Sequence, residues 1–336
     1  MSQPVRIGLI GTGRIGQVHA SSIAAVDDAV LQWVCDPFGD SAERTAARYG
    51  GQATLESGDV LKADDVDALI IASPTPTHVD LISAAIDAGL PVLCEKPIDL
   101  DITRVDELRA RAASATKPIM LGFNRRFDPH FGELRRRVAD GVIGKLEQLV
   151  ITSRDPKPAP AAYIASSGGI FRDMTIHDFD MARYFVPDIV EVTARGANQF
   201  SEDIKALGDY DAVLVVLTGA GGEQISITNS RHSAYGYDQR VEVFGPDGML
   251  QVGNIADSVV RFHSATAVES LAPYQNFFLE RYTVAYRREL EEFVRAARGE
   301  PAVYPGFEDG RAALLLADAA EESARTGRTI AVDLGR

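Results

Sequence analysis

Short apolar runs alternate with helical patterns along the first 121 residues of the chain. The run at residues 66–72 is nearly all apolar, which is typical of a strand buried on both faces of a parallel sheet. Strands that alternate with helices in this way predict an α/β domain with a doubly wound parallel sheet over residues 1–121. The predicted strands are residues 5–10, 30–35, 66–72, 91–94 and 118–121, and the predicted helices follow residue 16 and cover 41–49, 78–88 and 102–115.

The pattern changes after Gly122. Residues 128–140 predict a helix, with Asp128 as its N-cap and Pro129 at its first position. Longer β-runs follow, some of them separated by glycine-containing turns. The sequence therefore predicts a second, α+β domain over residues 122–336, built on a largely antiparallel open sheet. Its predicted strands are residues 145–152, 189–197, 212–218, 224–229, 240–245 and 258–263, and its closing helices are residues 274–298 and 308–326.

Composition excludes several classes of protein. The 336 residues carry a net charge of −14, which argues against nucleic acid or an anionic membrane surface as a partner. A strand begins at Val5, so we expect no signal segment, and no apolar run approaches the length that spans a membrane. The two cysteines, Cys35 and Cys94, both end predicted strands, so we expect a reducing, cytoplasmic setting rather than a disulfide framework.

A glycine-rich turn joins the first predicted strand to the first helix, with the sequence Gly-Thr-Gly-Arg-Ile-Gly at residues 11–16. Gly11 permits the tight turn, Gly13 lets the backbone approach a pyrophosphate, and Gly16 lets helix and strand pack closely. The helix N-terminus offers N–H groups to the phosphates. We therefore predict a dinucleotide site rather than a purely structural turn, and we expect the phosphates at Gly11, Gly13, Arg14, Ile15 and Gly16.

Asp36 ends the second predicted strand, 20 residues beyond Gly16. A carboxylate there can accept hydrogen bonds from both ribose hydroxyls of NAD, and it would repel the 2′-phosphate of NADP. Pro37 and Phe38 follow, so no adjacent basic residue is present to bind that phosphate. The sequence predicts NAD as the cofactor.

Other polar residues follow the strands of the same sheet and should face the dinucleotide. Ser73 and Thr75 come after the strand at 66–72, and His78 begins the next helix. Glu95 and Lys96 follow the strand at 91–94, at the edge where a nicotinamide would lie. Lys96 can stabilise an alkoxide or polarise a carbonyl oxygen; an exposed lysine paired with Glu95 is the alternative. The Lys96–Pro97 bond is also a candidate cis peptide.

Asp173 and His177 stand four residues apart, and so on one face if their segment is helical. An aspartate beside a histidine fixes its tautomer, which suits a general base that takes a hydroxyl proton. In the alternative, Asp173 caps a helix and His177 is merely polar. A metal site on Asp173 and His177 is disfavoured, because no second histidine or cysteine is near them in sequence.

Further polar clusters are candidates for a substrate cleft between the two domains. Asn124 and Arg126 follow the last parallel strand, and residues 229–232 and Tyr235 follow a strand of the second domain. Amide, guanidinium and phenol groups suit a substrate with many hydroxyls, although ordinary loop chemistry is the alternative. We list Asn124, Arg126, Asp173, His177 and Tyr235 as candidate substrate-binding residues.

Taken together, these motifs resemble the Gfo/Idh/MocA oxidoreductases over essentially the whole chain. Residues 11–16, Glu95-Lys96-Pro97 and the pair Asp173 and His177 occur in the order and approximate spacing of that family. Within it, residues 122–128, 168–173 and 235–240 look most like inositol 2-dehydrogenases. The resemblance implies a Rossmann domain, catalysis by Lys96, Asp173 and His177, and a homotetramer formed through the second-domain sheet.

The activity that the resemblance implies is NAD-dependent oxidation of a ring secondary alcohol of an inositol, such as myo-inositol to its 2-keto form. A dehydrogenase of another inositol isomer or of an aldose sugar is the close alternative. Two alternatives come from other classes: a sensor that holds NAD without turnover, and a metal-dependent lyase or isomerase. The expected partner is a small polyol or sugar.

Overall fold

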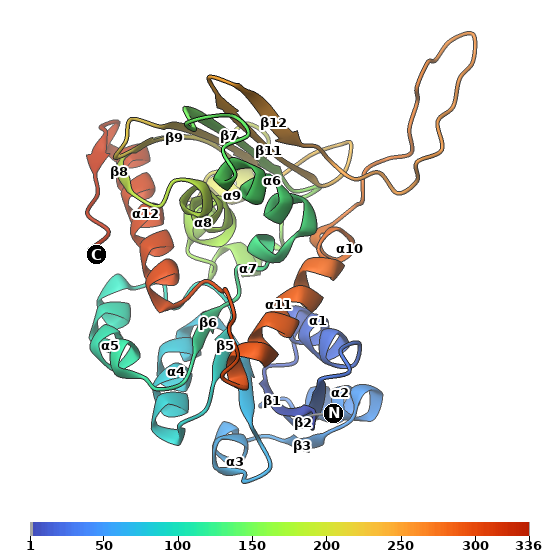
Figure 1. Ribbon diagram of the computed structural model, residues 1–336, viewed down its shortest axis with the longest axis vertical. Coiled ribbons are helices and arrows are strands. Elements are labelled where there is room, and N and C mark those ends of the chain that lie inside the picture. Colours follow the sequence, from blue (N-terminus) through green and yellow to red (C-terminus); the bar gives the residue numbers. More distant parts are fainter. Residues whose placement is uncertain (1–2, 336) are drawn as a thin grey trace. The chain divides into compact units, whose positions relative to one another are not determined.

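Parallel strands form the sheet of the first unit in the computed structural model, which describes residues 3–335 (Figure 1). The strand order is β3-β2-β1-β4-β5-β6, so the chain reverses its direction of winding between β1 and β4. The doubly wound fold predicted for this part is confirmed, and β3 joins it as a short edge strand. The elements are β1 (Val5–Ile10), α1 (Arg14–Ile23), β2 (Ala29–Cys35), α2 (Gly39–Tyr49), β3 (Gln52–Thr54), α3 (Ser57–Lys62), β4 (Ala68–Ile71), α4 (His78–Ala88), β5 (Val92–Cys94), α5 (Ile102–Ser114), β6 (Ile119–Leu121) and α11 (Thr283–Ala297).

Helix α11 belongs to this first unit although it follows the second unit in sequence. The first unit consists of residues 1–127 and 284–311. Leu290, Phe293 and Val294 of α11 share a buried core with strands β1 and β2 and with helices α1 and α2. The domain boundary expected between residues 121 and 122 stays a prediction. The compact first unit also contains a later segment of the chain, residues 284–311.

A mixed sheet forms the second unit, which consists of residues 128–283 and 312–336. Its order is β12-β11-β7-β10-β9-β8-β13, and only the β7–β10 pair is parallel among the described strands. The largely antiparallel sheet expected for the second part is confirmed. The elements are α6 (Pro129–Ala139), β7 (Gln148–Arg154), α7 (Ala161–Ile164), α8 (Ile176–Phe185), β8 (Ile189–Ala197), α9 (Glu202–Ala206), β9 (Ala212–Gly219), β10 (Gln224–Ser230), β11 (Asp238–Gly245), β12 (Gly248–Val252), α10 (Phe278–Arg281), α12 (Phe307–Thr326) and β13 (Ile330–Ala331).

Helices α6, α8 and α12 lie on one face of this sheet (Figure 1). The other face is open, and alternate residues of its strands are exposed. Leu214 and Val216 of β9 lie on the open face, while Val213, Val215 and Leu217 are buried toward the helices. Strand register places exposed Val150, Phe244 and Met249 on the same open face. This face therefore carries exposed apolar side chains on either side of β10, which contributes Ser226 and Thr228 to it.

Asp128 begins α6 as predicted. Its Oδ1 atom accepts hydrogen bonds from the backbone N–H groups of His130 and Phe131, at 3.0 and 3.1 Å. Its other oxygen pairs with the buried guanidinium of Arg281. One carboxylate therefore caps α6 and ties α10 to it.

The segment between β12 and α10 differs from expectation. Residues 258–263 do not form a strand of the sheet; they belong to an arm that extends away from the second unit (Figure 1). Two isolated bridges, Ala256 to Tyr274 and Phe262 to Ser270, hold the arm together. The β-branched run favours extended backbone, but no neighbouring strand of the described chain pairs with it. The closing helix predicted over residues 274–298 is divided into α10, which begins at Phe278, and α11, which begins at Thr283.

Candidate active site

The glycine-rich turn after β1 has the geometry that its sequence predicts. Gly11 has φ of +96°, which an L side chain rarely adopts, and a Cβ there would lie 2.4 Å from the backbone nitrogen of Ser73. A Cβ on Gly16 would lie 2.1 Å from the Gly11 carbonyl oxygen. Gly13 differs, because no atom of the described residues lies within 4 Å of its built Cβ. Gly11 and Gly16 therefore shape the turn, and Gly13 keeps one side of it open at the start of α1, where Arg14 and Ile15 follow.

Asp36 connects the end of β2 to this turn. Its Oδ2 atom accepts from the Thr12 backbone N–H at 2.9 Å and from the Thr12 hydroxyl at 2.8 Å. Its Oδ1 atom accepts from the Phe38 N–H at 2.9 Å. The carboxylate thus holds the turn and remains able to accept further hydrogen bonds, because each oxygen has more than one lone pair.

His78 joins the loops that follow β4 and β5. Its ring is 1% exposed, with Nδ1 at 2.7 Å from the Pro97 carbonyl oxygen and Nε2 at 2.8 Å from the Ser73 carbonyl oxygen. The Ser73 hydroxyl contacts Thr77 at 2.6 Å, in the short helical turn that begins at Thr75. His78 therefore supports the loop of Ser73 and Thr75, and its contact with a cofactor stays a prediction.

Glu95 is buried rather than placed at the surface. Its Oε1 atom lies 2.8 Å from Nε2 of His19 on α1. A Cβ on Gly122 would lie 2.9 Å from the Glu95 carboxyl, so glycine at that position makes room for this side chain. Lys96 follows, and the Lys96–Pro97 peptide bond is cis, as the sequence suggested.

Asn124 and Arg126 follow β6 in a short helical turn. Asn124 is 2% exposed, and its Nδ2 atom has no hydrogen-bond partner among residues 3–335. A buried amide donor without a partner is costly, and a ligand that accepts its hydrogen bond removes that cost. Arg126 donates to Asp309 at 3.0 Å within the same unit.

Asp173 lies in a π-helical turn, Phe171–Thr175, which continues directly into α8 with His177 in its first turn. Asp173 is not the N-cap itself, because residues before and after it are helical, but it lies in the first turn of this segment, so the alternative of a structural residue near the N-cap stays open. π-helical turns inside helices occur frequently at functional sites. Asp173 accepts from the Tyr163 hydroxyl at 2.9 Å and from Nη1 of Arg231 at 3.2 Å.

Arg231 is 1% exposed and connects two carboxylates, since its Nη2 atom donates to Asp209 at 3.0 Å. Asp209 also accepts from the Ile170 N–H at 2.9 Å, just before the π-helical turn. The sequence placed Arg231 in a polar cluster but could not pair it with Asp173, which is 58 residues away. Tyr163 is therefore the site residue that sequence reasoning missed, and for Arg231 it missed the pairing with Asp173.

A second set of hydrogen bonds fixes the same helix to β10. Asn229 accepts from the Thr175 hydroxyl at 2.6 Å and donates to Asp178 at 2.7 Å. Asp178 and Thr175 are fully buried, and Asn229 is nearly so. The segment that carries Asp173 and His177 is therefore held on both sides within its own unit.

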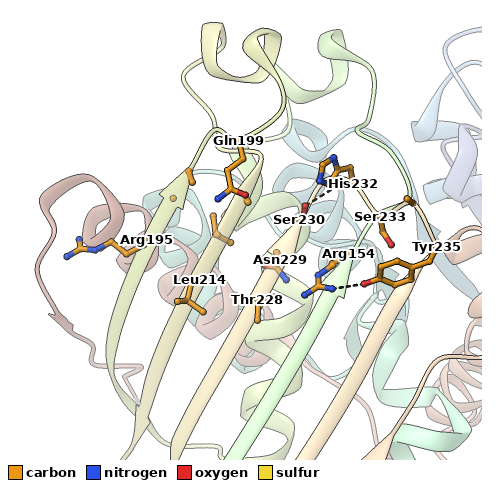
Figure 2. Close-up of a pocket in the computed structure, with 15 residues that line it drawn as sticks. Arg154, Arg195, Gln199, Leu214, Thr228, Asn229, Ser230, His232, Ser233 and Tyr235 are labelled. Atoms are coloured by element: carbon orange, nitrogen blue, oxygen red, sulfur yellow. Dashed lines mark hydrogen bonds between the residues drawn. The ribbon is translucent and has the colours of Figure 1, made fainter.

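Tyr235 lies at the edge of a pocket of about 530 Å³ on the open face of the sheet (Figure 2). Its hydroxyl donates to Asp238 at 2.6 Å and lies 2.5 Å from Nη1 of Arg154. Burial raises the pKa of the Asp238 carboxyl, but hydrogen bonds from Arg240, Tyr235 and Asn254 outweigh it and hold the pKa below its ordinary value. Asp173 and His177 do not line this pocket.

Residues 3–335 contain no group of three or more His, Cys, Asp or Glu side chains that can hold a metal ion. No helix within them is both long and apolar enough to cross a membrane. Cys35 and Cys94 are free and buried.

Two family models match the chain. Residues 5–123 match the model described as an oxidoreductase family with an NAD-binding Rossmann fold. Residues 131–251 match the GFO/IDH/MocA C-terminal domain. The two matches follow one another along the chain and divide it much as the strand patterns do.

Relatives match over nearly the full length. The chain is 45% identical to an inositol 2-dehydrogenase of Rhizobium meliloti, over 98% of this chain and 99% of the relative. The crystal structure of a myo-inositol dehydrogenase from Corynebacterium glutamicum has a TM-score of 0.95 and 55% identity, with 98% and 99% of the two chains covered. A scyllo-inositol dehydrogenase from Lactobacillus casei, solved with bound NAD(H) and scyllo-inositol, has a TM-score of 0.90 and 28% identity, with 98% and 99% covered. The chain belongs to the Gfo/Idh/MocA family of oxidoreductases.

Proposed function

We propose that this protein is an NAD-dependent inositol 2-dehydrogenase, which oxidises a ring secondary alcohol of inositol to a ketone. One observation carries the proposal: the full-length similarity to inositol dehydrogenases coincides with Lys96, Asp173 and His177 in the order and approximate spacing of the family's motifs. The natural substrate class is a small polyol with several ring hydroxyls.

NAD fits the residues of the first unit. Gly11, Gly13 and Gly16, with Arg14 and Ile15, hold the pyrophosphate at the start of α1, where the side of Gly13 is open. Asp36 holds the ribose hydroxyls, and the loops of Ser73, Thr75 and Glu95 complete the site. NAD, when bound, supplies a hydride acceptor.

His177 acts as the general base that takes the proton of the reacting hydroxyl, and Asp173 orients it. Arg231 and Tyr163 support that role of Asp173, because they hold both of its oxygens. Lys96 donates a hydrogen bond to the substrate oxygen and stabilises its negative charge as hydride leaves the carbon. Because a base must be neutral to take a proton, activity should rise with pH.

Further polar residues are candidates for orienting the substrate. The buried amide of Asn124, whose Nδ2 atom has no partner in residues 3–335, supports a hydrogen bond to a substrate or cofactor oxygen. Arg126 and Tyr235 are the further candidates. Each is held by a carboxylate of its own unit, Asp309 and Asp238 respectively.

The test is turnover of Lys96→Ala and His177→Ala, measured by the absorbance of reduced nicotinamide with myo-inositol and NAD. Each change should lower kcat by about 100-fold or more, because proton transfer and charge stabilisation each contribute that much. NAD binding, measured by titration calorimetry, should remain largely intact. The exposed residues Lys117 and His130, changed to alanine, are the matched controls. Near-normal turnover of Lys96→Ala or His177→Ala contradicts the assignment.

Another inositol isomer is the second candidate, since a relative with this fold binds scyllo-inositol. A panel of inositols and aldoses, each with NAD and with NADP, separates these substrates by kcat/KM. Binding of NAD without turnover of any panel member would instead favour a sensor. Loss of activity with a chelator would favour the metal-dependent alternative.

We further propose that the protein is a cytoplasmic homotetramer assembled through the open face of the second-unit sheet. The exposed side chains of Leu214, Val216, Phe244 and Met249 support this assembly, because their burial against another copy removes apolar surface from water. Light scattering of the Leu214→Glu variant should then show a smaller particle than the parent. An unchanged mass in both a Leu214→Glu and a Val216→Glu variant contradicts the interface.

A further inference from the structure

Three ionisable side chains meet inside the first unit, and the proposed chemistry uses none of their protons. They are His19 of α1, Glu95 after β5 and Glu289 of α11, which are 1%, 7% and 0% exposed. His19 lies 2.8 Å from Glu95. The edge of Tyr286, which precedes Glu289 by one helical turn, meets the His19 ring with centroids 5.8 Å apart. Helix α11 therefore brings Glu289 to the hydrogen-bonded pair of His19 and Glu95.

Glu289 is the unusual member of this cluster. Both of its carboxyl oxygens lack a hydrogen-bond partner among residues 3–335. Burial, reinforced by repulsion from Glu95, raises its pKa well above the ordinary value. The titratable groups around it are Glu95, His19 and Tyr286, and no lysine or arginine is paired with it in the described part of the chain. A negative charge at Glu289 would have no contact with bulk water and no lysine or arginine partner to stabilise it.

We propose that Glu289 is a positioning residue that remains a neutral acid in the working enzyme and thereby fixes Glu95, and with it Lys96. A neutral Glu289 leaves Glu95 as the single anion of the cluster. A neutral Glu289 also carries an O–H group, which is a hydrogen-bond donor. An ionised Glu289 would repel Glu95 instead.

The position of Glu95 matters for Lys96 because the two residues are adjacent at the end of β5. The Glu95 backbone N–H donates to the Ile71 carbonyl at 2.9 Å, and its carboxyl fills the space that Gly122 leaves open. A Glu95 side chain that shifts within this tight space moves the peptide that carries Lys96. This step rests on the proposed role of Lys96, whereas the neutral state of Glu289 does not.

The neutral state is tested without any activity measurement. Unfolding of the first unit by urea is followed through Trp33 of β2, the one tryptophan in the chain. The parent, Glu289→Gln and Glu291→Gln are compared at several pH values; Glu291 is exposed on the same helix. Above the ordinary pKa of glutamate, unfolding of the parent releases one proton more than unfolding of Glu289→Gln. The ratio of their unfolding constants should therefore change by about tenfold per pH unit, toward a less stable parent.

Glu291→Gln should follow the parent at every pH. A pH-independent ratio between the parent and Glu289→Gln overturns the neutral state of Glu289. Positioning is tested by turnover of Glu289→Gln and Glu289→Met near neutral pH. Glutamine keeps a donor and adds no charge, so its kcat should remain within about threefold of the parent.

Glu289→Met removes the donor, and its kcat should fall by about 10- to 100-fold with little change in the KM for NAD. Equal losses in both variants would mean that the anion of Glu289 is needed, which overturns the proposal. A fully active Glu289→Met variant also overturns it. Should Glu289→Met not fold, the kcat of Glu289→Gln still decides. Failure of Lys96→Ala to lose activity would contradict the proposed function instead, so the two failures are distinguishable.

Discussion

Arg231 should determine both the stability of the second unit and the activity of Asp173. The perturbation is Arg231→Met, which keeps an unbranched side chain and removes the guanidinium with its charge. In the parent, the guanidinium lies 3.2 Å from Asp173 and 3.0 Å from Asp209, and it is 1% exposed. The variant leaves two carboxylates without their cation in a place that water scarcely reaches.

Removing one partner of a buried ion pair costs about 3–5 kcal/mol, because the remaining charge stays buried. For a unit of this size, that cost corresponds to a fall in Tm of roughly 10 °C. Asp173 also loses its orientation, so kcat for inositol should fall by about 100-fold. The Tm and kcat of Arg231→Lys should lie between those of the parent and of Arg231→Met, since an ammonium group cannot contact both carboxylates as the planar guanidinium does.

The assays are differential scanning calorimetry and steady-state turnover. Arg136→Met is the matched control, because Arg136 also contacts two carboxylates, Glu133 and Asp140, but on the surface of α6. Its Tm and kcat should not change. Adding Asp209→Asn to Arg231→Met should recover part of the lost stability, because one unpaired charge is then gone. A Tm within 2 °C or so of the parent for Arg231→Met, with unchanged kcat, refutes the reasoning.

Three further predictions concern the first unit. Gly13→Ala should fold normally but bind NAD at least about tenfold more weakly. Gly16→Ala should instead lose about 1–3 kcal/mol or more of stability, because its Cβ would lie 2.1 Å from a backbone carbonyl oxygen. Equal melting temperatures of the two variants would contradict this contrast. Asp36→Asn should lower the preference for NAD over NADP, measured as the ratio of kcat/KM values, by about tenfold or more, and an unchanged ratio would show that the carboxylate does not select the cofactor. Burial raises the pKa of the Cys35 thiol to about 11 and that of the Cys94 thiol well above its ordinary value. Both thiols should therefore react with a thiol reagent at pH 8 only after unfolding, and rapid labelling of the native protein would contradict their burial.

Local patterns predicted the fold of the first unit because its strands are short, apolar and buried on both faces. The glycine-rich turn was also predictable from the local sequence, because the steric roles of Gly11 and Gly16 are local. The arm at residues 256–274 was not predictable, because its apolar β-forming residues read as a strand although no partner strand exists for them in the described chain.

Contacts between residues far apart in the sequence explain why part of the candidate site could not be predicted. The motif positions Lys96 and Asp173 were evident, but the residues that support them come from distant segments. Arg231 reaches Asp173 across 58 residues, and His19 reaches Glu95 across 76. Helical periodicity alone puts Glu289 on the apolar face of α11 with Tyr286 and Phe293. Only tertiary structure shows that it is fully buried there and which groups it meets.

The late position of α11 in the chain has a consequence for synthesis on the ribosome. The parallel sheet is complete once residue 121 is made, yet Leu290, Phe293 and Val294 of its core are still absent. At about 5–20 residues per second, the nascent sheet waits roughly 10–30 s for them. During that time the apolar face later covered by α11 is exposed to solvent and to other nascent chains. The helix that carries Glu289 is therefore the last core element of the first unit to be synthesised. A chaperone that shields this apolar face would act in that interval.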